Sequence, residues 1–329
     1  MHRRLDGEPM SKTWCFFVLA SVAIFGIHFS SAAQPRRTNP LPPSVQQVAT
    51  SDGDSRVSVQ QDISYGTVDG QRLFLDVYEP SELSQASGDP HPAVVLIHGG
   101  GWSGFDKGTM RGMGMFLARS GFVAFSIDYR LFQSNEKGAK NPWPAQLDDA
   151  QRAVRWIRAN AAKYHIDADH IGAFGHSAGG QMAALLGLEP ARDNSDPMLS
   201  KYSSTVQAVV SVDAPTDFTM DRDAHGDAFL TKFLGGDHAH HLGLWRDASP
   251  VFHVSKNTAP FLILHGTQDV EVPMAQAQEL YDRLTEAGVP VKFVKVEDIH
   301  TFEKPEARKR LALETQAFFT QYLQPGNPK

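Results

Sequence analysis

Short apolar runs alternate with segments of helical periodicity along most of this chain. Val, Ile, Leu, Phe and Ala dominate six runs, at residues 93–97, 123–127, 171–174, 206–212, 261–264 and 291–296. Helical spacing of apolar residues accompanies them, for example at 144–164, 274–287 and 305–322. Continuous apolar runs are typical of strands buried on both faces, and their alternation with helices indicates parallel βαβ units. We therefore predict a single doubly wound α/β sheet that is mostly parallel.

Two further features of the fold are expected. An N-terminal antiparallel hairpin is predicted because residues 63–66 and 73–78 flank Asp69-Gly70, a dipeptide that favours tight hairpin turns. The longest stretch between two predicted strands runs from Thr216 to Pro250 and is long enough for a small cap insertion. No internal repeat or second domain is indicated, so residues 59–325 are expected to form one domain.

Residues 1–33 have the pattern of a secretory signal peptide. Basic residues precede an apolar run at 14–27, and small residues follow it at 30–33, as in a signal with its cleavage site. The apolar run is shorter than the about 20 residues that a membrane-spanning helix needs. We expect cleavage between Ala33 and Gln34, and a secreted or periplasmic protein without a stable membrane span. An uncleaved membrane anchor is the alternative.

The composition of the rest of the chain excludes several kinds of site and partner. Residues 34–58 are rich in Pro, Ser and Gln, which predicts a flexible leader. Cys15 is the only cysteine and would be lost with the signal, so no disulfide, thiolate–zinc site or cysteine nucleophile is expected. Without residues 1–33 the charge count is 28 basic against 35 acidic residues, or −7, since 31 − 3 = 28 and 37 − 2 = 35. No basic run indicates a nucleic-acid partner.

A pentapeptide, Gly175-His176-Ser177-Ala178-Gly179, follows the apolar run at 171–174 and opens a small-residue helical segment at 181–188. A serine on a tight strand-to-helix turn presents its hydroxyl at the edge of the sheet, and glycines are needed where the turn leaves no room for side chains. The pattern predicts Ser177 as a nucleophile. A glycine-rich turn with an incidental serine is the alternative.

Serine needs a base, an acid that orients the base, and donors for the oxyanion it creates. Three glycines, 99–101, follow the apolar run at 93–97, and the N–H of Gly100 or Gly101 with that of Ala178 is expected to form the oxyanion hole. Trp102 is expected either to line the substrate pocket or to pack in the core. His176 is expected to pack at the turn that carries Ser177, with lining of the same pocket as the alternative.

Asp269 and His300 are the predicted acid and base. Asp269 follows the apolar run at 261–264, and His300 is the only histidine after it, which completes the order Ser, Asp, His. Asp213 is a rival acid because it follows the preceding run, and Asp217 is a weaker one. His98 is expected to order its loop.

These residues resemble the α/β-hydrolase superfamily over residues 63–323. Longer stretches at 98–102, 126–130, 143–149, 171–180, 248–250 and 262–273 are similar to the branch related to bifunctional feruloyl/acetylxylan esterases. The resemblance implies Ser177 as nucleophile, Asp269 as acid and His300 as base, with an oxyanion hole near Gly100, Gly101 and Ala178. It also implies that residues 128–130 and Asp149 belong to the scaffold.

The expected function is a serine carboxylesterase that hydrolyses small acyl esters through an acyl-enzyme. Sugar-linked acetate or ferulate is favoured by the resemblance only. A serine peptidase, an arylformamidase-like amide hydrolase and an inactive hydrolase-fold binding protein are the alternatives. No phosphate loop or dinucleotide fingerprint is found, so no cofactor is expected. His238, His240 and His241 are unevenly spaced, so no metal site is expected. The expected partner is a small-molecule or carbohydrate ester, and the oligomeric state is not indicated.

Overall fold

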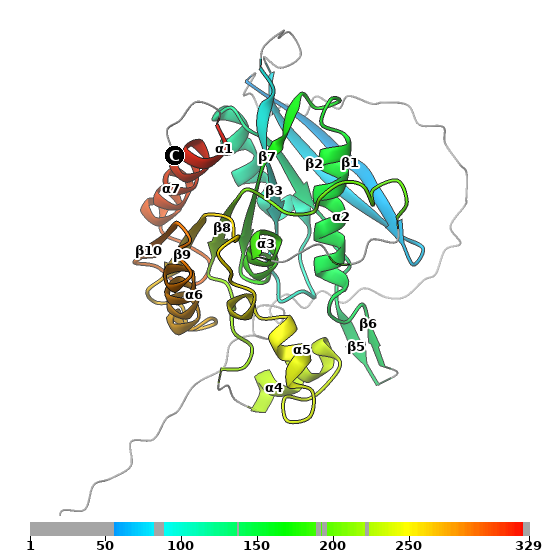
Figure 1. Ribbon diagram of the computed structural model, residues 1–329, viewed down its shortest axis with the longest axis vertical. Coiled ribbons are helices and arrows are strands. Elements are labelled where there is room, and N and C mark those ends of the chain that lie inside the picture. The colour runs from blue at the N-terminus through cyan, green and yellow to red at the C-terminus, as the bar shows by residue number, and fades with distance from the viewer. Residues whose placement is uncertain are drawn as a thin grey trace, which may run out of the picture. The chain divides into compact units, whose positions relative to one another are not determined.

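Eight strands in the described part of the chain form one mixed sheet, in the order β1-β2-β4-β3-β7-β8-β9-β10 (Figure 1). Their bounds are β1 Val57–Val68, β2 Gln71–Pro80, β3 His91–Ile97, β4 Val123–Ile127, β7 Ile166–His176, β8 Ala208–Val212, β9 Phe261–Gly266 and β10 Val291–Val296. β2 pairs antiparallel with β1 and with β4, and the other neighbours are parallel. The predicted mostly parallel sheet with an N-terminal hairpin is confirmed.

The computed structural model describes residues 56–81, 89–136, 138–188, 192, 196–220 and 224–324, and all of them belong to one compact unit, residues 47–329. The predicted signal peptide at 1–33 and residues 34–55 of the predicted leader lie outside the described residues. β1 begins at Val57, two residues inside the segment expected to be a leader. Its pairing with β2 explains this, because Val57 and Ser58 lie opposite residues 80 and 79.

Helices cover both faces of the sheet. Apolar residues of α2 (Ala145–Ala159), α3 (Ala178–Leu188) and α6 (Met274–Glu286) pack in one buried cluster. Those of α1 (Arg111–Arg119) and α7 (Pro305–Leu323) pack in another. In β3, Val95 contributes to the first cluster, whereas Val94 and Leu96 contribute to the second. Both faces are therefore buried, which is why this strand reads as a continuous apolar run.

Some elements differ from the periodicity prediction. β7 begins at Ile166 rather than at residue 171, and α2 ends at Ala159 rather than at 164. Helix α1 was not predicted because glycines interrupt its apolar face. A Cβ on Gly114 would lie 2.5 Å from the ring of Tyr78, so this glycine lets α1 pack directly on β2. The short exposed hairpin of β5 (Gln133–Asn135) and β6 (Gly138–Lys140) was also missed.

The insertion between β8 and β9 contains α4 (Ala224–Leu234) and α5 (Leu242–Asp247), which lie beyond the carboxyl ends of the strands (Figure 1). Phe233 of α4 packs on Trp102, with ring centroids 4.6 Å apart. The insertion is therefore fixed to the loop that follows β3, and the predicted small insertion is confirmed. None of the described helices combines the length and the apolar character needed to cross a bilayer.

The strand order places a topological switch beside β3. This strand pairs with β4 on one side and with β7 on the other, so the chain winds outward in both directions from this point. Open α/β sheets bind ligands at the carboxyl ends of their strands near such a switch. The loops after β3 and β7 carry residues 98–102 and Ser177, which places these motifs side by side.

A buried ion pair joins the scaffold residues named above. Arg130 Nε lies 2.9 Å from Asp149 Oδ2, and the Arg130 backbone N–H donates to the same oxygen at 2.8 Å. The two side chains are only 8% and 1% exposed. Because both charges have left water, each depends on the other for compensation. The pair ties α2 to the loop after β4.

Asp149→Asn is expected to destabilise the protein by about 3–5 kcal/mol, because it leaves the Arg130 guanidinium buried without its main countercharge. The adjacent Asp148 is the matched control, since its side chain is 40% exposed and pairs with Arg192 at 3.1 Å. Asp148→Asn should cost less than about 1 kcal/mol. Urea unfolding at neutral pH measures the free energy of unfolding of both variants. Equal decreases would show that the buried ion pair contributes no more to stability than the exposed one.

Candidate functional site

Ser177 lies on a sharp turn between the last residue of β7 and the first residue of α3. Its φ is 54°, a left-handed value that non-glycine residues rarely adopt. The flanking glycines are required: a Cβ on Gly175 would lie 2.0 Å from the Gly179 carbonyl oxygen, and one on Gly179 would lie 2.1 Å from that of Ile97. The Ser177 N–H donates to the Val212 carbonyl at 2.8 Å. The predicted strand–turn–helix setting of this serine is therefore present.

His300 and Asp269 are hydrogen-bonded on neighbouring loops. His300 Nδ1 donates to Asp269 Oδ2 at 2.7 Å, and the Asp269 side chain is fully buried. Asp269 Oδ1 accepts the N–H groups of Glu271 at 2.8 Å and Val272 at 2.9 Å. Burial alone would raise the pKa of Asp269, but the hydrogen bond and charge of His300 and these N–H donors lower it below its usual value. The group is therefore a carboxylate at neutral pH.

The contact with Asp269 fixes how His300 can act. Nδ1 carries the proton of that hydrogen bond, so Nε2 is the nitrogen left to accept another. Burial disfavours the imidazolium, yet the hydrogen bond and charge of Asp269, with a smaller contribution from Glu271, raise the pKa of His300. Glu271 Oε2 lies 3.9 Å from Nε2. His300 can therefore take up a proton and hold it for a short time.

Asp213, the rival acid, has a different environment. It is fully buried at the end of β8, and its Oδ1 accepts the Gly266 N–H at 2.8 Å. Its Oδ2 lies 3.8 Å from His176 Nε2 and has no hydrogen-bond partner among the described residues. Burial, reinforced by the charge of Asp269, raises the pKa of Asp213 to about 8. Asp213 is thus mostly a neutral acid at pH 7, while Asp269 holds the hydrogen bond to His300.

Asp217, the weaker rival, forms hydrogen bonds within its own turn. Its Oδ1 accepts the Thr219 N–H at 2.7 Å and the Thr219 hydroxyl at 2.6 Å. These bonds are local and fix the start of the insertion.

The loop after β3 contacts the serine turn. A Cβ on Gly99 would lie 3.2 Å from Ser177 Cβ, so the two backbones are almost in contact. Gly100 and Gly101 follow on this loop with φ values of 103° and 55°. Ala178 is the first residue of α3, so its N–H has no partner within the helix. Gly100 and Gly101 thus follow directly on the residue that contacts the serine turn, and Ala178 follows Ser177 itself.

His98 holds the loop after β3 in place through a hydrogen bond and ring stacking. It is buried, its Nδ1 lies 2.8 Å from the Gly99 carbonyl oxygen, and its ring stacks on Tyr129 at 4.2 Å. The Tyr129 hydroxyl in turn lies 3.0 Å from the His98 carbonyl and 3.2 Å from that of Gly99. Burial lowers the pKa of His98 to about 4, so it is neutral at pH 7. The resemblance implied that Tyr129 belongs to the scaffold, and these contacts show that it holds the loop after β3.

Trp102 is a packing residue in this structure. Only 6% of it is exposed, and its indole N–H donates to Gln181 Oε1 at 3.1 Å. Its ring contacts Phe218 at 5.6 Å and Phe233 at 4.6 Å. Of the two roles left open for Trp102, the structure favours packing, since the residue joins the loop after β3 to α3 and to the insertion.

His176 lies between the serine turn and the base. Its Nε2 donates to the backbone carbonyl of His300 at 2.7 Å, and the two rings are 4.9 Å apart at 49°. Its side chain is 22% exposed. The expected packing role is thus accompanied by a specific hydrogen bond that the sequence did not indicate.

Three exposed apolar side chains occur on the loops that carry these groups. Phe105 is 68% exposed, Val270 is 77% and Ile299 is 38%. Val270 adjoins Asp269, Ile299 adjoins His300, and a Cβ on Gly100 would lie 2.7 Å from Phe105 Cδ2. Sequence reasoning missed these residues because single apolar residues in loops carry no periodic signal. Each of them is next to a predicted site residue, in the chain or by contact.

Among the described residues, two groups of side chains are close enough to share a cation: His176 with Asp213 and His300, and Asp213 with His265 and Asp269. In both groups ring nitrogens already bind the protein. His176 Nε2 donates to the His300 carbonyl, His300 Nδ1 to Asp269, and His265 Nε2 lies 2.9 Å from the Val272 carbonyl. A cation would have to compete with these hydrogen bonds. His240 Nδ1 lies 2.8 Å from Asp237, on the exposed insertion.

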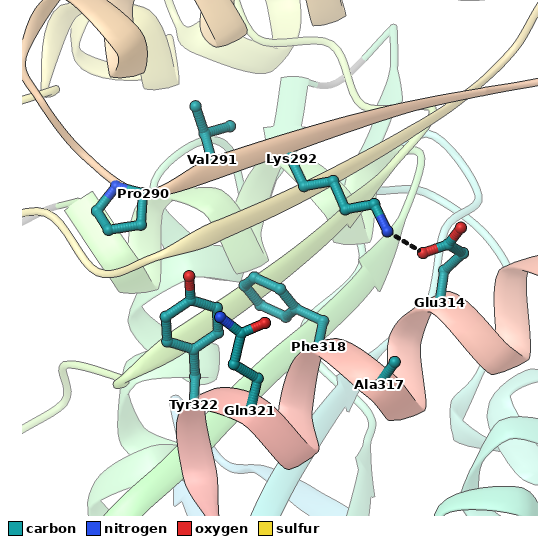
Figure 2. Close-up of a pocket in the computed structure, with 8 residues that line it drawn as sticks. All are labelled: Pro290, Val291, Lys292, Glu314, Ala317, Phe318, Gln321 and Tyr322. Atoms are coloured by element: carbon teal, nitrogen blue, oxygen red, sulfur yellow. Dashed lines mark hydrogen bonds and ion pairs between the residues drawn. The ribbon is translucent and has the colours of Figure 1, made fainter. Parts of the chain in front are cut away.

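A cavity of about 370 Å³ lies elsewhere, between the start of β10 and the last turns of α7 (Figure 2). Its lining includes Pro290, Phe318 and Tyr322, and Lys292 pairs with Glu314 across one side. Because β10 begins here and His300 follows its other end, this cavity is at the opposite edge of the sheet. It contains none of the predicted site residues, and ligands of such sheets bind at the carboxyl edge.

Asp213→Asn is expected to gain stability relative to the wild type as the pH rises. The folded wild type keeps the Asp213 proton up to about pH 8, whereas the unfolded chain loses it near about pH 4. The free energy of unfolding of the wild type therefore falls progressively as the pH rises between these values. That of Asp213→Asn does not show this fall, because asparagine does not titrate. Urea unfolding of both proteins from about pH 5 to pH 8 measures the difference. A pH-independent difference would mean that Asp213 is already ionised when folded.

The sequence matches proteins of one family and several curated esterases. Residues 75–284 match the BD-FAE family model. A Mycobacterium tuberculosis protein named "Probable carboxylic ester hydrolase LipM" is 31% identical over 232 residues, covering 69% of this chain and 52% of that protein. Esterase LipC of the same organism is 32% identical, with coverage of 68% and 54%. The chain thus spans about half the length of these curated relatives.

Solved structures share the fold. The esterase Est2 of Thermogutta terrifontis superimposes with a TM-score of 0.68 at 24% identity, covering 83% of this chain and 95% of that one. A truncated carbohydrate esterase from gut microbiota superimposes with a TM-score of 0.66 at 27% identity, covering 82% and 97%. The sheet, the serine turn and these matches agree, and the chain belongs to the BD-FAE family of α/β-hydrolases.

Proposed function

We propose that this protein is a serine carboxylic-ester hydrolase whose triad is Ser177, His300 and Asp269. The observation that carries the proposal is the 2.7 Å hydrogen bond from His300 Nδ1 to the buried carboxylate of Asp269, next to a serine on a strained strand-to-helix turn. Buried polar groups are arranged in this way where a base must be held in one tautomer. The similarity to curated ester hydrolases supports the same reaction.

Acylation follows from this arrangement. Ser177 Oγ attacks the ester carbonyl carbon while His300 Nε2 takes the hydroxyl proton. The negative charge moves to the carbonyl oxygen, where the N–H groups of Gly100 or Gly101 and of Ala178 stabilise it. The C–O bond to the alcohol then breaks, and the His300 imidazolium gives its proton to the leaving oxygen. Asp269 stabilises that imidazolium, in keeping with the raised pKa of His300.

Deacylation repeats these steps with water. His300 Nε2 takes a proton from a water molecule, which attacks the acyl carbon. The tetrahedral oxygen is held by the same N–H donors, and the proton returns to Ser177 Oγ as the acid leaves. The water molecule supplies the proton that Ser177 recovers and the hydroxyl that the acid keeps, so the step balances.

The proposed substrates are small, uncharged acyl esters, with acetyl or feruloyl esters of plant-type polysaccharides as the favoured natural class. The exposed apolar side chains of Phe105, Val270 and Ile299, next to site residues, favour uncharged groups. Glu271, close to His300 Nε2, disfavours anionic ones. Membership of the BD-FAE family and likeness to a carbohydrate esterase support the sugar-linked class. Turnover of acetylated xylan and methyl ferulate, beside short chromogenic esters and amides, tests it.

Export remains part of the proposal. The signal-like pattern of residues 1–33 supports a secreted or periplasmic protein in which a leader from residue 34 precedes the domain that begins with β1 at Val57. N-terminal sequencing of the protein recovered from culture medium and periplasm would test the cleavage after Ala33.

Ser177→Ala should lose ester turnover and fluorophosphonate labelling, because residues 175–179, which form the turn, contain no other hydroxyl. The expected loss in kcat is on the order of 10⁴-fold or more. Ser103→Ala is the matched control, since Ser103 lies on the glycine loop with its Oγ a marginal 3.5 Å from the Gly100 carbonyl. Labelling that survives in Ser177→Ala would refute the assignment.

Asp269→Asn should lower kcat by roughly 10³–10⁴-fold and move the acidic limb of the pH profile to lower pH. The sign follows from the charge: without the carboxylate the His300 imidazolium is less stable, so its pKa falls and the neutral base persists to lower pH. Asp213→Asn is the control, because this acid is mostly neutral at pH 7. A larger loss in Asp213→Asn would make Asp213 the acid.

A further inference from the structure

We propose that His176, the residue before the nucleophile, is a positioning residue that fixes the base by donating a hydrogen bond from Nε2 to the backbone carbonyl of His300. The inference rests on the proposed function, since it names what holds His300 in line with Ser177. It assigns a role to a side chain that the hydrolysis steps do not use.

The geometry defines the tautomer of His176. A carbonyl oxygen can only accept a hydrogen bond, so the 2.7 Å contact requires a proton on Nε2. The other nitrogen faces the glycine loop, where a Cβ on Gly99 would lie 3.3 Å from Nδ1. The ring is thus confined between the loop after β3 and the loop after β10.

The base loop is held at several points, and His176 supplies the one at His300 itself. The Gln268 N–H donates to the Asp298 carbonyl at 2.9 Å. The Asp298 carboxylate accepts the N–H groups of Ile299 at 2.9 Å and Lys304 at 2.8 Å. These bonds fix the residues on either side of His300. The bond from His176 fixes the peptide from which the His300 side chain projects.

Two anchors then determine the direction of His300 Nε2. Asp269 holds the ring at Nδ1, and His176 holds the main chain behind it. With only the first anchor, the ring can pivot about Asp269 and carry Nε2 away from Ser177. A misplacement of about 1 Å is enough to cost roughly 100-fold in rate.

The anchor also joins base and nucleophile into one unit. His176 is covalently bonded to Ser177, whose strained φ of 54° is fixed by close packing of the glycines around it. Because the same short segment carries the nucleophile and holds the base, a shift of the turn moves both groups together. Their relative position is thereby protected from independent motion of the two loops.

The charge of His176 suits this role. Burial, with repulsion from His300 as the next cause, lowers its pKa to about 4. A neutral imidazole 4.9 Å from His300 does not oppose the imidazolium that forms during each step, whereas a cation there would. Asp213 Oδ2 at 3.8 Å is the nearest carboxylate facing His176, and it too is mostly neutral at pH 7.

The test uses two substitutions of matched size. His176→Gln keeps a side-chain N–H donor at about the place of Nε2, and His176→Met has a similar length without a donor. We expect His176→Met to lose roughly 10- to 100-fold in kcat with KM nearly unchanged, and His176→Gln to recover most of it.

His91→Leu is the control for losing a histidine-to-carbonyl hydrogen bond. His91 Nδ1 lies 2.8 Å from the Gly121 carbonyl oxygen at the amino end of β3, away from the site. It should alter stability and leave kcat unchanged. Equal activity of His176→Met and wild type, or equal kcat losses in the Met and Gln variants, would overturn the positioning role.

A second measurement separates this inference from the proposed function. The NMR resonance of the proton between His300 Nδ1 and Asp269 reports the setting of the base without any substrate. It should shift or broaden in His176→Met and stay near its wild-type position in His176→Gln. If the wild type hydrolyses no ester, the proposed function fails on that result alone. An unchanged resonance in His176→Met would refute the positioning role by itself.

Discussion

The close packing of three backbones around Ser177 is the constraint on which the site depends. Gly175 and Gly179 let the end of β7, the start of α3 and the end of β3 approach to distances that no Cβ could tolerate. This approach forces the serine into its left-handed conformation and brings the glycine loop against it. Strain of this kind persists only where the surrounding structure over-determines it, and here the central strands of the sheet supply that support.

Chemically similar groups at this end of the sheet have different charge states. Asp269 receives two N–H donors and the His300 ring, so it stays ionised. Asp213 receives one N–H donor and is fully buried, so it stays protonated to about pH 8. Among the histidines, the hydrogen bond and charge of Asp269 raise the pKa of His300 against the effect of burial, while burial lowers the pKa of His176 despite its hydrogen bond to a carbonyl. Local donors and burial decide these states, not residue type.

Much of this arrangement could be predicted from particular residues. The runs Val123–Ile127 and Val291–Val296 became strands with those bounds. The first is fully buried because both faces of the sheet are covered there, whereas the second is the edge strand and exposes Lys292 and Lys295. The glycines around Ser177 marked the turn, and Asp269 and His300 stood at strand ends. Helix α1 was missed because Gly114 serves its packing on Tyr78, a contact between distant segments. The hydrogen bond from His176 to the His300 carbonyl was also missed, since it joins residues 124 positions apart.

The sequence by itself determined the doubly wound sheet, the turn that presents Ser177, and the short set of acids and histidines available to it. Those features depend on local patterns: apolar runs, glycines at fixed offsets, and residues placed at strand ends. Only the tertiary structure decided which acid contacts His300, that Trp102 is buried, and that His176 holds the base. These outcomes depend on which strands are neighbours and on how much water each group loses, and neither is written in the spacing of residues along the chain.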